Sequence, residues 1–108
     1  MSRAAALILL CALAAPALAA ELAVAPELWD RPRSARAVLE QPAIREAVRV
    51  YLAEAASRLV IHHGYGQNPL LQAEELRAWL MTLAIDESRI SLASDAKPGE
   101  SLKIEVVK

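Results

Sequence analysis

The chain is poor in the residues that carry most enzyme and metal chemistry. Among 108 residues it has one cysteine, Cys11, and two histidines. Because Cys11 lies in an N-terminal segment that we expect to be removed, the mature protein would have no disulfide and no cysteine metal ligand. Lys and Arg total 12 against 13 Asp and Glu. This balance excludes the basic surface typical of nucleic-acid-binding domains and of polybasic membrane anchors.

The first 20 residues have the pattern of an export signal. A basic start at Arg3 precedes an apolar run over residues 4–15, and Ala17-Leu18-Ala19 follows with the small-x-small pattern of signal peptidase sites. We therefore expect cleavage after Ala19 or Ala20 and a periplasmic mature protein.

Cys11 suggests an alternative, because a cysteine in a signal can accept a lipid. Lipid acceptor sites need a small residue immediately before the cysteine, and here Leu10 stands there. We therefore favour plain cleavage at the alanine-rich site.

The mature chain would be one small domain of about 88 residues. Without Arg3, 11 basic residues remain against 13 acidic ones. No later apolar run approaches the roughly 20 residues of a membrane span, so no span is expected in the mature chain. Residues 21–34, which contain Pro26, Trp29 and Pro32, predict an irregular entry segment with Trp29 packed onto the domain.

Periodicity predicts an α+β fold for residues 35–108, a small two-layer α/β sandwich in the order (β)αβαββ. A mixed sheet would have two helices on one face. Residues 35–39 fit a short strand or a helix start. We expect a helix at Pro42–Ala56, a central strand at Arg58–His63, and a second helix that is capped by Asn68 and runs to Ala84. The C-terminus is expected to form a hairpin of strands 89–93 and 101–106, joined through a type II turn at Lys97–Glu100.

The apolar positions of these elements predict one core. Its members share a helical stripe or an inward strand position: Ile44, Val48, Leu52, Leu59, Ile61, Leu76, Leu80, Leu83, Ile90, Leu92, Leu102 and Ile104.

His62 and His63 are candidate ligand-binding residues, because they end the central strand, where open α/β sheets place ligands. Neighbouring strand residues point to opposite faces, so the two imidazoles are not expected to chelate one metal. A single-metal site would need Asp86, Asp95 or a glutamate beside one of them. We predict no metal ligands from the sequence and favour structural or surface roles for the two histidines, with a ligand contact or a pH-sensitive contact as the alternative.

No motif predicts an enzyme or a cofactor. Gly64-Tyr65-Gly66 lacks the third glycine of a dinucleotide fingerprint and the lysine of a phosphate loop, so it predicts a plain turn. The chain has no Gly-x-Ser-x-Gly elbow and no Cys–His pair. We expect a protein without catalytic residues and without a cofactor.

Residues 59–106 resemble the second half of an OmpA-like domain, the periplasmic module that grips peptidoglycan. The resemblance rests on the strand Leu59–Gly64, on Arg77-Ala78 within a helix, and on the link Ile85–Ile90. It implies a similar fold and a ligand-binding role for Arg77. In this family an aspartate and an arginine bind the ammonium and the carboxylate of diaminopimelate, and the strand usually ends Gly-His-Thr-Asp. Here no aspartate lies near His63, so the acidic half of this binding site is missing.

Three functions follow as expectations. The first is an exported, non-enzymatic domain that binds an envelope protein or a cell-wall component. The second is a diverged peptidoglycan binder that uses Arg77 and the His62–Gln67 loop. The third is a periplasmic metal-binding protein that uses His62 or His63.

Overall fold

The computed structural model describes residues 20–54 and 56–108; the expected export signal lies almost entirely outside them. A four-stranded mixed sheet has the strand order β1-β4-β2-β3. The strand β2 pairs in parallel with β3 and antiparallel with β4, and β4 pairs antiparallel with β1. The elements are β1 (Ala20–Ala23), the 3-10 helix η1 (Pro26–Asp30), α2 (Ala35–Leu39), α3 (Pro42–Ala53), β2 (Arg58–His62), α4 (Gln67–Thr82), the 3-10 helix η2 (Glu87–Arg89), β3 (Ile90–Ala93) and β4 (Lys103–Val107).

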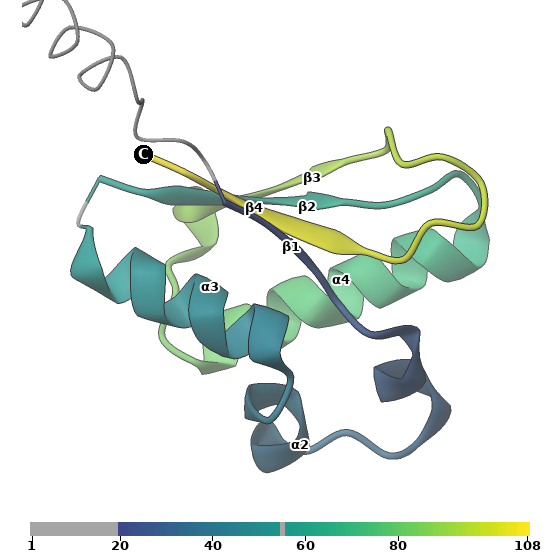
Figure 1. Cartoon of the computed structure of the whole chain (residues 1–108), viewed down its shortest axis with the longest axis horizontal. Helices are drawn as coiled ribbons and strands as arrows, with labels where there is room; N and C mark the ends of the chain where they lie inside the picture. The colour runs from purple at the N-terminus through teal and green to yellow at the C-terminus, as the bar shows by residue number, and fades with distance from the viewer. Residues whose placement is uncertain (1–19, 55) are drawn as a thin grey trace, which may run out of the picture.

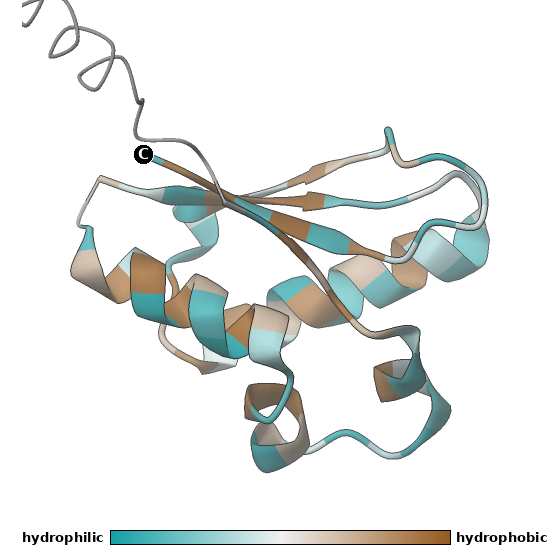
Figure 2. Cartoon of the chain, in the orientation of Figure 1, coloured by the Kyte–Doolittle hydropathy of each residue, from teal (hydrophilic) through white to brown (hydrophobic). Residues whose placement is uncertain are grey.

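The sheet forms one layer and the helices α3 and α4 form the other, on the same side of it (Figure 1). Inward strand residues such as Leu59, Ile61 and Ile104 are fully buried against Ile44, Leu76 and Leu80 of the helices, which confirms the predicted two-layer α/β fold. Strand side chains alternate between faces, and the apolar and polar residues of β4 alternate accordingly (Figure 2).

No helix covers the opposite side of the sheet in the described part of the chain (Figure 1). We call this side the open face. Its residues occupy the positions that alternate with the buried ones: Glu21 and Ala23 of β1, Arg58, Val60 and His62 of β2, Ser91 and Ala93 of β3, and Lys103, Glu105 and Val107 of β4.

The sheet begins earlier than the sequence indicated. Residues 20–23 form the edge strand β1, whereas an irregular segment was expected from Glu21, and the domain therefore includes residues 20–34. Four residues are too few for periodicity to identify a strand. Residues 35–39, for which the sequence fits either a short strand or a helix start, form the helix α2. Ser34 caps this helix by accepting a hydrogen bond from the Ala37 amide.

The predicted C-terminal hairpin is wrong. Although β3 and β4 follow one another in sequence, β2 lies between them. The expected turn is present, with Glu100 N–H bonded to Lys97 C=O at 3.0 Å and a φ of +84° at Gly99. It lies in the connection that carries the chain from the β3 edge across β2. A central position suits β4, because Ile104 and Val106 are both buried.

Both long helices form where predicted, with shifted ends. The helix α3 ends at Ala53, and Leu52 in its last turn is 67% exposed, so its assignment to the core is wrong. The helix α4 begins at Gln67, after Gly66 at a φ of +108°, so Asn68 lies inside the first turn instead of capping it. No described helix has the length and apolarity to span a membrane.

Trp29 packs against the core, as predicted, and an ionic cluster links its segment to α4. The Arg33 guanidinium lies over the Trp29 ring at 5.4 Å and donates two hydrogen bonds to the Glu75 carboxylate, at 2.7 and 2.9 Å. The Trp79 indole N–H donates to the same carboxylate at 3.1 Å. These contacts connect residues 29–33 to α4 in the helical layer.

Candidate metal centre

The His62 imidazole lies on the open face between two carboxylates. Its Nδ1 is 2.7 Å from Asp95 Oδ1, and its Nε2 is 2.8 Å from Glu105 Oε1. The His62 side chain is 18% exposed, that of Glu105 27% and that of Asp95 59%. The site is therefore half-buried at its base and open to solvent above.

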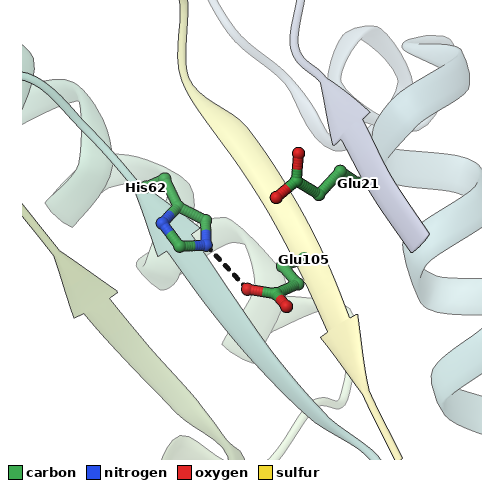
Figure 3. A group of neighbouring side chains, drawn as sticks. All are labelled: Glu21, His62 and Glu105. Atoms are coloured by element: carbon green, nitrogen blue, oxygen red, sulfur yellow. Dashed lines mark hydrogen bonds and ion pairs between the residues drawn. The ribbon is translucent and has the colours of Figure 1, made fainter. Parts of the chain in front are cut away.

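Strand register brings a second glutamate to this place. Glu21 of β1 lies directly opposite Glu105 of β4, and both point to the open face. Ligand atoms of Glu21, His62 and Glu105 all lie within 4.8 Å of one another. Figure 3 shows the three side chains, which come from the three neighbouring strands β1, β2 and β4 and converge above the sheet.

Two like charges directly opposite in an antiparallel pair destabilise a sheet. The Glu21–Glu105 pair is therefore costly unless a cation lies beside it. His62 supplies positive charge to this pair when it is protonated, since its Nε2 contacts Glu105. Lys103, which lies opposite His62 in the register of β2 and β4, places its ammonium 3.5 Å from Glu100.

Two backbone hydrogen bonds of His63, the residue that follows His62, hold the segment that carries Asp95 next to the His62 side chain. The His63 N–H donates to Ala93 C=O at 2.8 Å, and the Ala96 N–H donates to His63 C=O at 3.1 Å. These two bonds fasten the ends of the short segment that carries Asp95. The carboxylate is thereby positioned at the imidazole edge that faces away from Glu105.

The pair of carboxylates changes the acidity of His62. Partial burial by itself lowers the pKa of His62, whereas the hydrogen bonds and negative charges of Asp95 and Glu105 raise it. The net result is a pKa above the usual 6.5. An imidazole that donates from both nitrogens must be protonated, so without another cation the site favours the imidazolium form.

The donor set suits a divalent metal ion. One imidazole nitrogen and two carboxylates are ligands that zinc and other first-row divalent ions accept. Donor atoms around one tetrahedral ion lie roughly 3.4 Å apart for bonds of about 2.1 Å, so the exposed Glu21 side chain has to turn inward to complete the set. A hollow of about 160 Å³ beside Glu21 and His62 leaves room for this movement and for water ligands.

Asp95 then supports the metal-binding histidine without binding the ion itself. Metal-binding histidines usually donate their second ring N–H to a carboxylate, which fixes the tautomer and makes the metal-binding nitrogen more basic. The contact of Asp95 with Nδ1 does this for His62 and leaves Nε2 directed at the two glutamates.

The two histidines diverge, as strand geometry requires. His63 is buried, 6% exposed, and its Nδ1 lies 2.9 Å from Gly64 C=O. Its side chain forms no hydrogen bond with Glu21, His62, Asp95 or Glu105 of the His62 cluster. A single-metal site was expected to need a carboxylate beside one histidine. At His62 this carboxylate is supplied by Asp95 and by glutamates that the sequence did not single out. Asp86, the other candidate, instead caps η2 through Ser88.

Arg77 lies apart from this cluster. It is in the middle of α4, in the helical layer, and donates to Glu74 one turn earlier at 2.8 Å. His62 points to the open face on the other side of the sheet. The structure therefore does not bring Arg77 and His62 into one site.

No protein family, curated protein or solved structure matches this chain. The geometry of the open face is therefore the basis for the function argued below.

Proposed function

We propose that this chain is an exported, non-enzymatic binding domain and that its ligand at the open face is a first-row divalent metal ion. The observation that carries the proposal is the convergence of Glu21, His62 and Glu105, with ligand atoms within 4.8 Å of one another. The ion would take the place of the proton on His62 Nε2 and would neutralise the two opposed glutamates.

The electrostatics of the cluster favour such an ion. Glu21 and Glu105 carry two negative charges in direct opposition, and Asp95 adds a third on the far side of the imidazole. One imidazolium leaves this group negative. A divalent ion with a neutral His62 brings the group closer to neutrality, while the Asp95 contact keeps Nδ1 protonated.

Calorimetric titration of the purified protein with zinc tests the proposal. We expect one site per chain, with zinc binding lost in His62→Gln and Glu105→Gln and weakened in Glu21→Gln. Asp95→Asn should bind about 10- to 100-fold more weakly, because it removes the carboxylate that orients the imidazole. Calcium should compete poorly, because it requires six to eight oxygen ligands.

The matched control is Glu27→Gln, which removes an exposed glutamate of η1 and should bind zinc like the unmodified protein. Circular dichroism of each variant separates lost ligands from lost folding. Equal zinc binding by the His62→Gln, Glu105→Gln and unmodified proteins would refute the proposal.

An OmpA-like relationship remains part of the proposal. The order α3, β2, α4, β3, β4 supports it, because the resemblance implies helix, strand, helix and strands in this sequence. An envelope protein or cell-wall partner would fit an exported domain of this kind. Export itself is tested by mass spectrometry of a periplasmic fraction, where a mature N-terminus at Ala20 or Glu21 is expected.

A further inference from the structure

A second cavity lies on the open face, at the end where β2 and β3 begin. It has a volume of about 210 Å³ and is lined by Arg58, Val60 and Val107 on one side and by residues 88–91 on the other. Arg58 is four residues before His62 on β2, which places the two some 13 Å apart at about 3.3 Å per residue. The cavity is therefore separate from the metal centre.

Two arginines stand side by side at this cavity. Leu59 and Ile90 are register partners in the parallel pair of β2 and β3, and both are buried. Arg58 of β2 and Arg89, the last residue of η2, each precede one of these partners, and both line the cavity together with the open-face residues Val60 and Ser91. Adjacent like charges repel unless an anion lies between them.

Neither arginine of this pair forms an ion pair within the described residues. Asp86 Oδ1 accepts hydrogen bonds from the Ser88 N–H at 3.0 Å and the Ser88 hydroxyl at 3.1 Å, which lower the pKa of Asp86. Asp86 is near enough to Arg89 for the charge of the arginine to contribute to this lowered pKa, but it forms no ion pair with Arg89. By contrast, Arg33, Arg49 and Arg77 each pair with a glutamate.

The rest of the lining combines aliphatic side chains with the hydroxyls of Ser88 and Ser91. Val60 and Val107 supply aliphatic surface, and Ser91 is the register partner of Val60 on the neighbouring strand. Guanidinium groups bind carboxylates and phosphates through paired hydrogen bonds. Aliphatic side chains beside them favour a ligand that also has an apolar part.

From this arrangement we infer that the cavity binds a small organic anion, whose carboxylate or phosphate group lies between Arg58 and Arg89 and whose apolar body contacts Val60 and Val107. The hydroxyl of Ser91 is placed to donate a further hydrogen bond to the anion. This inference uses residues that the metal proposal does not use, so either can fail without the other.

The test is a chemical-shift titration of the ¹⁵N-labelled protein with four probes: acetate, benzoate, inorganic phosphate and phenyl phosphate. We expect saturable shifts of the Val60 and Ser91 amides. Benzoate and phenyl phosphate should bind more tightly than acetate and inorganic phosphate, because their rings contact the apolar lining. Comparison of the two ring-bearing probes shows which anionic group the arginines prefer.

Arg58→Gln and Arg89→Gln should each weaken binding of the preferred probe about tenfold or more, since each removes a hydrogen bond to a charged group. Arg58→Lys, which keeps the charge and loses the planar fork, should lie between them and the unmodified protein. The control is Arg36→Gln, at an exposed arginine of α2, and it should leave binding unchanged. Shifts that do not saturate, or an equal loss in the Arg36 variant, would overturn the inference.

Discussion

His62 Nδ1 lies 2.7 Å from Oδ1 of Asp95, a residue 33 positions later in the chain. With Glu105 at the opposite ring nitrogen, this contact makes the charge of the open face depend on the protonation of His62. The same contact keeps Nε2 as the nitrogen available to a metal. The behaviour of the cluster therefore depends on both pH and metal.

Without metal, stability should fall as the pH rises above about 6.5. The pKa of His62 is raised in the folded protein, and in the unfolded chain it returns to about 6.5. A raised folded pKa means that the stabilisation is complete below about pH 6.5 and is lost as the pH rises through the folded value.

Urea unfolding in the presence of a chelator, at a series of pH values from 5.5 to about 8.5, measures this effect. The His62→Gln variant should show a flatter profile over the same range, because it has no proton to lose. An unmodified protein whose stability does not change between these limits would contradict a raised pKa at His62.

Metal should fasten the edge strand β1 to the sheet. Glu21 lies on β1, and its proposed co-ligands lie on β2 and β4, so a bound ion would link three strands. At a concentration 100-fold above the dissociation constant, binding adds about 2.7 kcal/mol to the free energy of unfolding. Zinc should also slow hydrogen exchange of the Val24 amide, which bonds to Leu102 C=O at 2.8 Å just beyond β1.

The Glu21→Gln variant provides the comparison for this strand. It should keep its fold, because the side chain is exposed, and it should show little slowing of Val24 exchange when zinc is added. Equal slowing in both proteins would mean that zinc acts elsewhere.

The core prediction separates two leucines that the sequence treats alike. Leu76 is fully buried, whereas Leu52 is 67% exposed. Leu76→Ala should lower the free energy of unfolding by about 2–5 kcal/mol, and Leu52→Ala by less than about 1 kcal/mol. Denaturant unfolding of both variants checks the packing of α3 and α4. Similar losses at the two positions would place Leu52 in the core after all.

We expect no peptidoglycan binding of the usual OmpA-like kind. Arg77 can supply a cation for a carboxylate, but Glu74 already accepts a hydrogen bond from it at 2.8 Å. The loop after His63 contains no acid to hold the ammonium of diaminopimelate. An unpaired, desolvated ammonium costs most of the affinity of such a site.

Co-sedimentation of the purified protein with peptidoglycan sacculi tests this expectation, with Arg77→Ala as the comparison. Both proteins should remain in the supernatant. Retention of the unmodified protein that is lost in Arg77→Ala would establish the diverged peptidoglycan grip instead.

Local sequence signals predicted the elements whose residues carry a strong period or a specific turn chemistry. The strand β2, the helices α3 and α4 and the turn with Gly99 all formed where they were expected. The strand β1 was missed because four residues carry no usable period. The order of the strands was missed because the insertion of β4 between β1 and β2 depends on packing between distant segments.

The candidate site shows the same limit. His62 was singled out from its place at the end of a central strand, and the need for a carboxylate beside it was recognised. Which carboxylates arrive depends on strand order, since Glu21 and Glu105 become neighbours only when β1 pairs with β4. Asp95 reaches His62 because the backbone of His63 bonds Ala93 and Ala96. Such long-range pairings leave no mark in a single sequence.

The most direct test of the metal centre is the ¹⁵N spectrum of the two imidazoles during addition of one equivalent of zinc. We predict that Nε2 of His62 takes on the shift of a metal-bound nitrogen, that its Nδ1 stays protonated against Asp95, and that both nitrogens of His63 are unchanged. Unchanged His62 resonances at saturating zinc, or a shift confined to His63, would contradict the account.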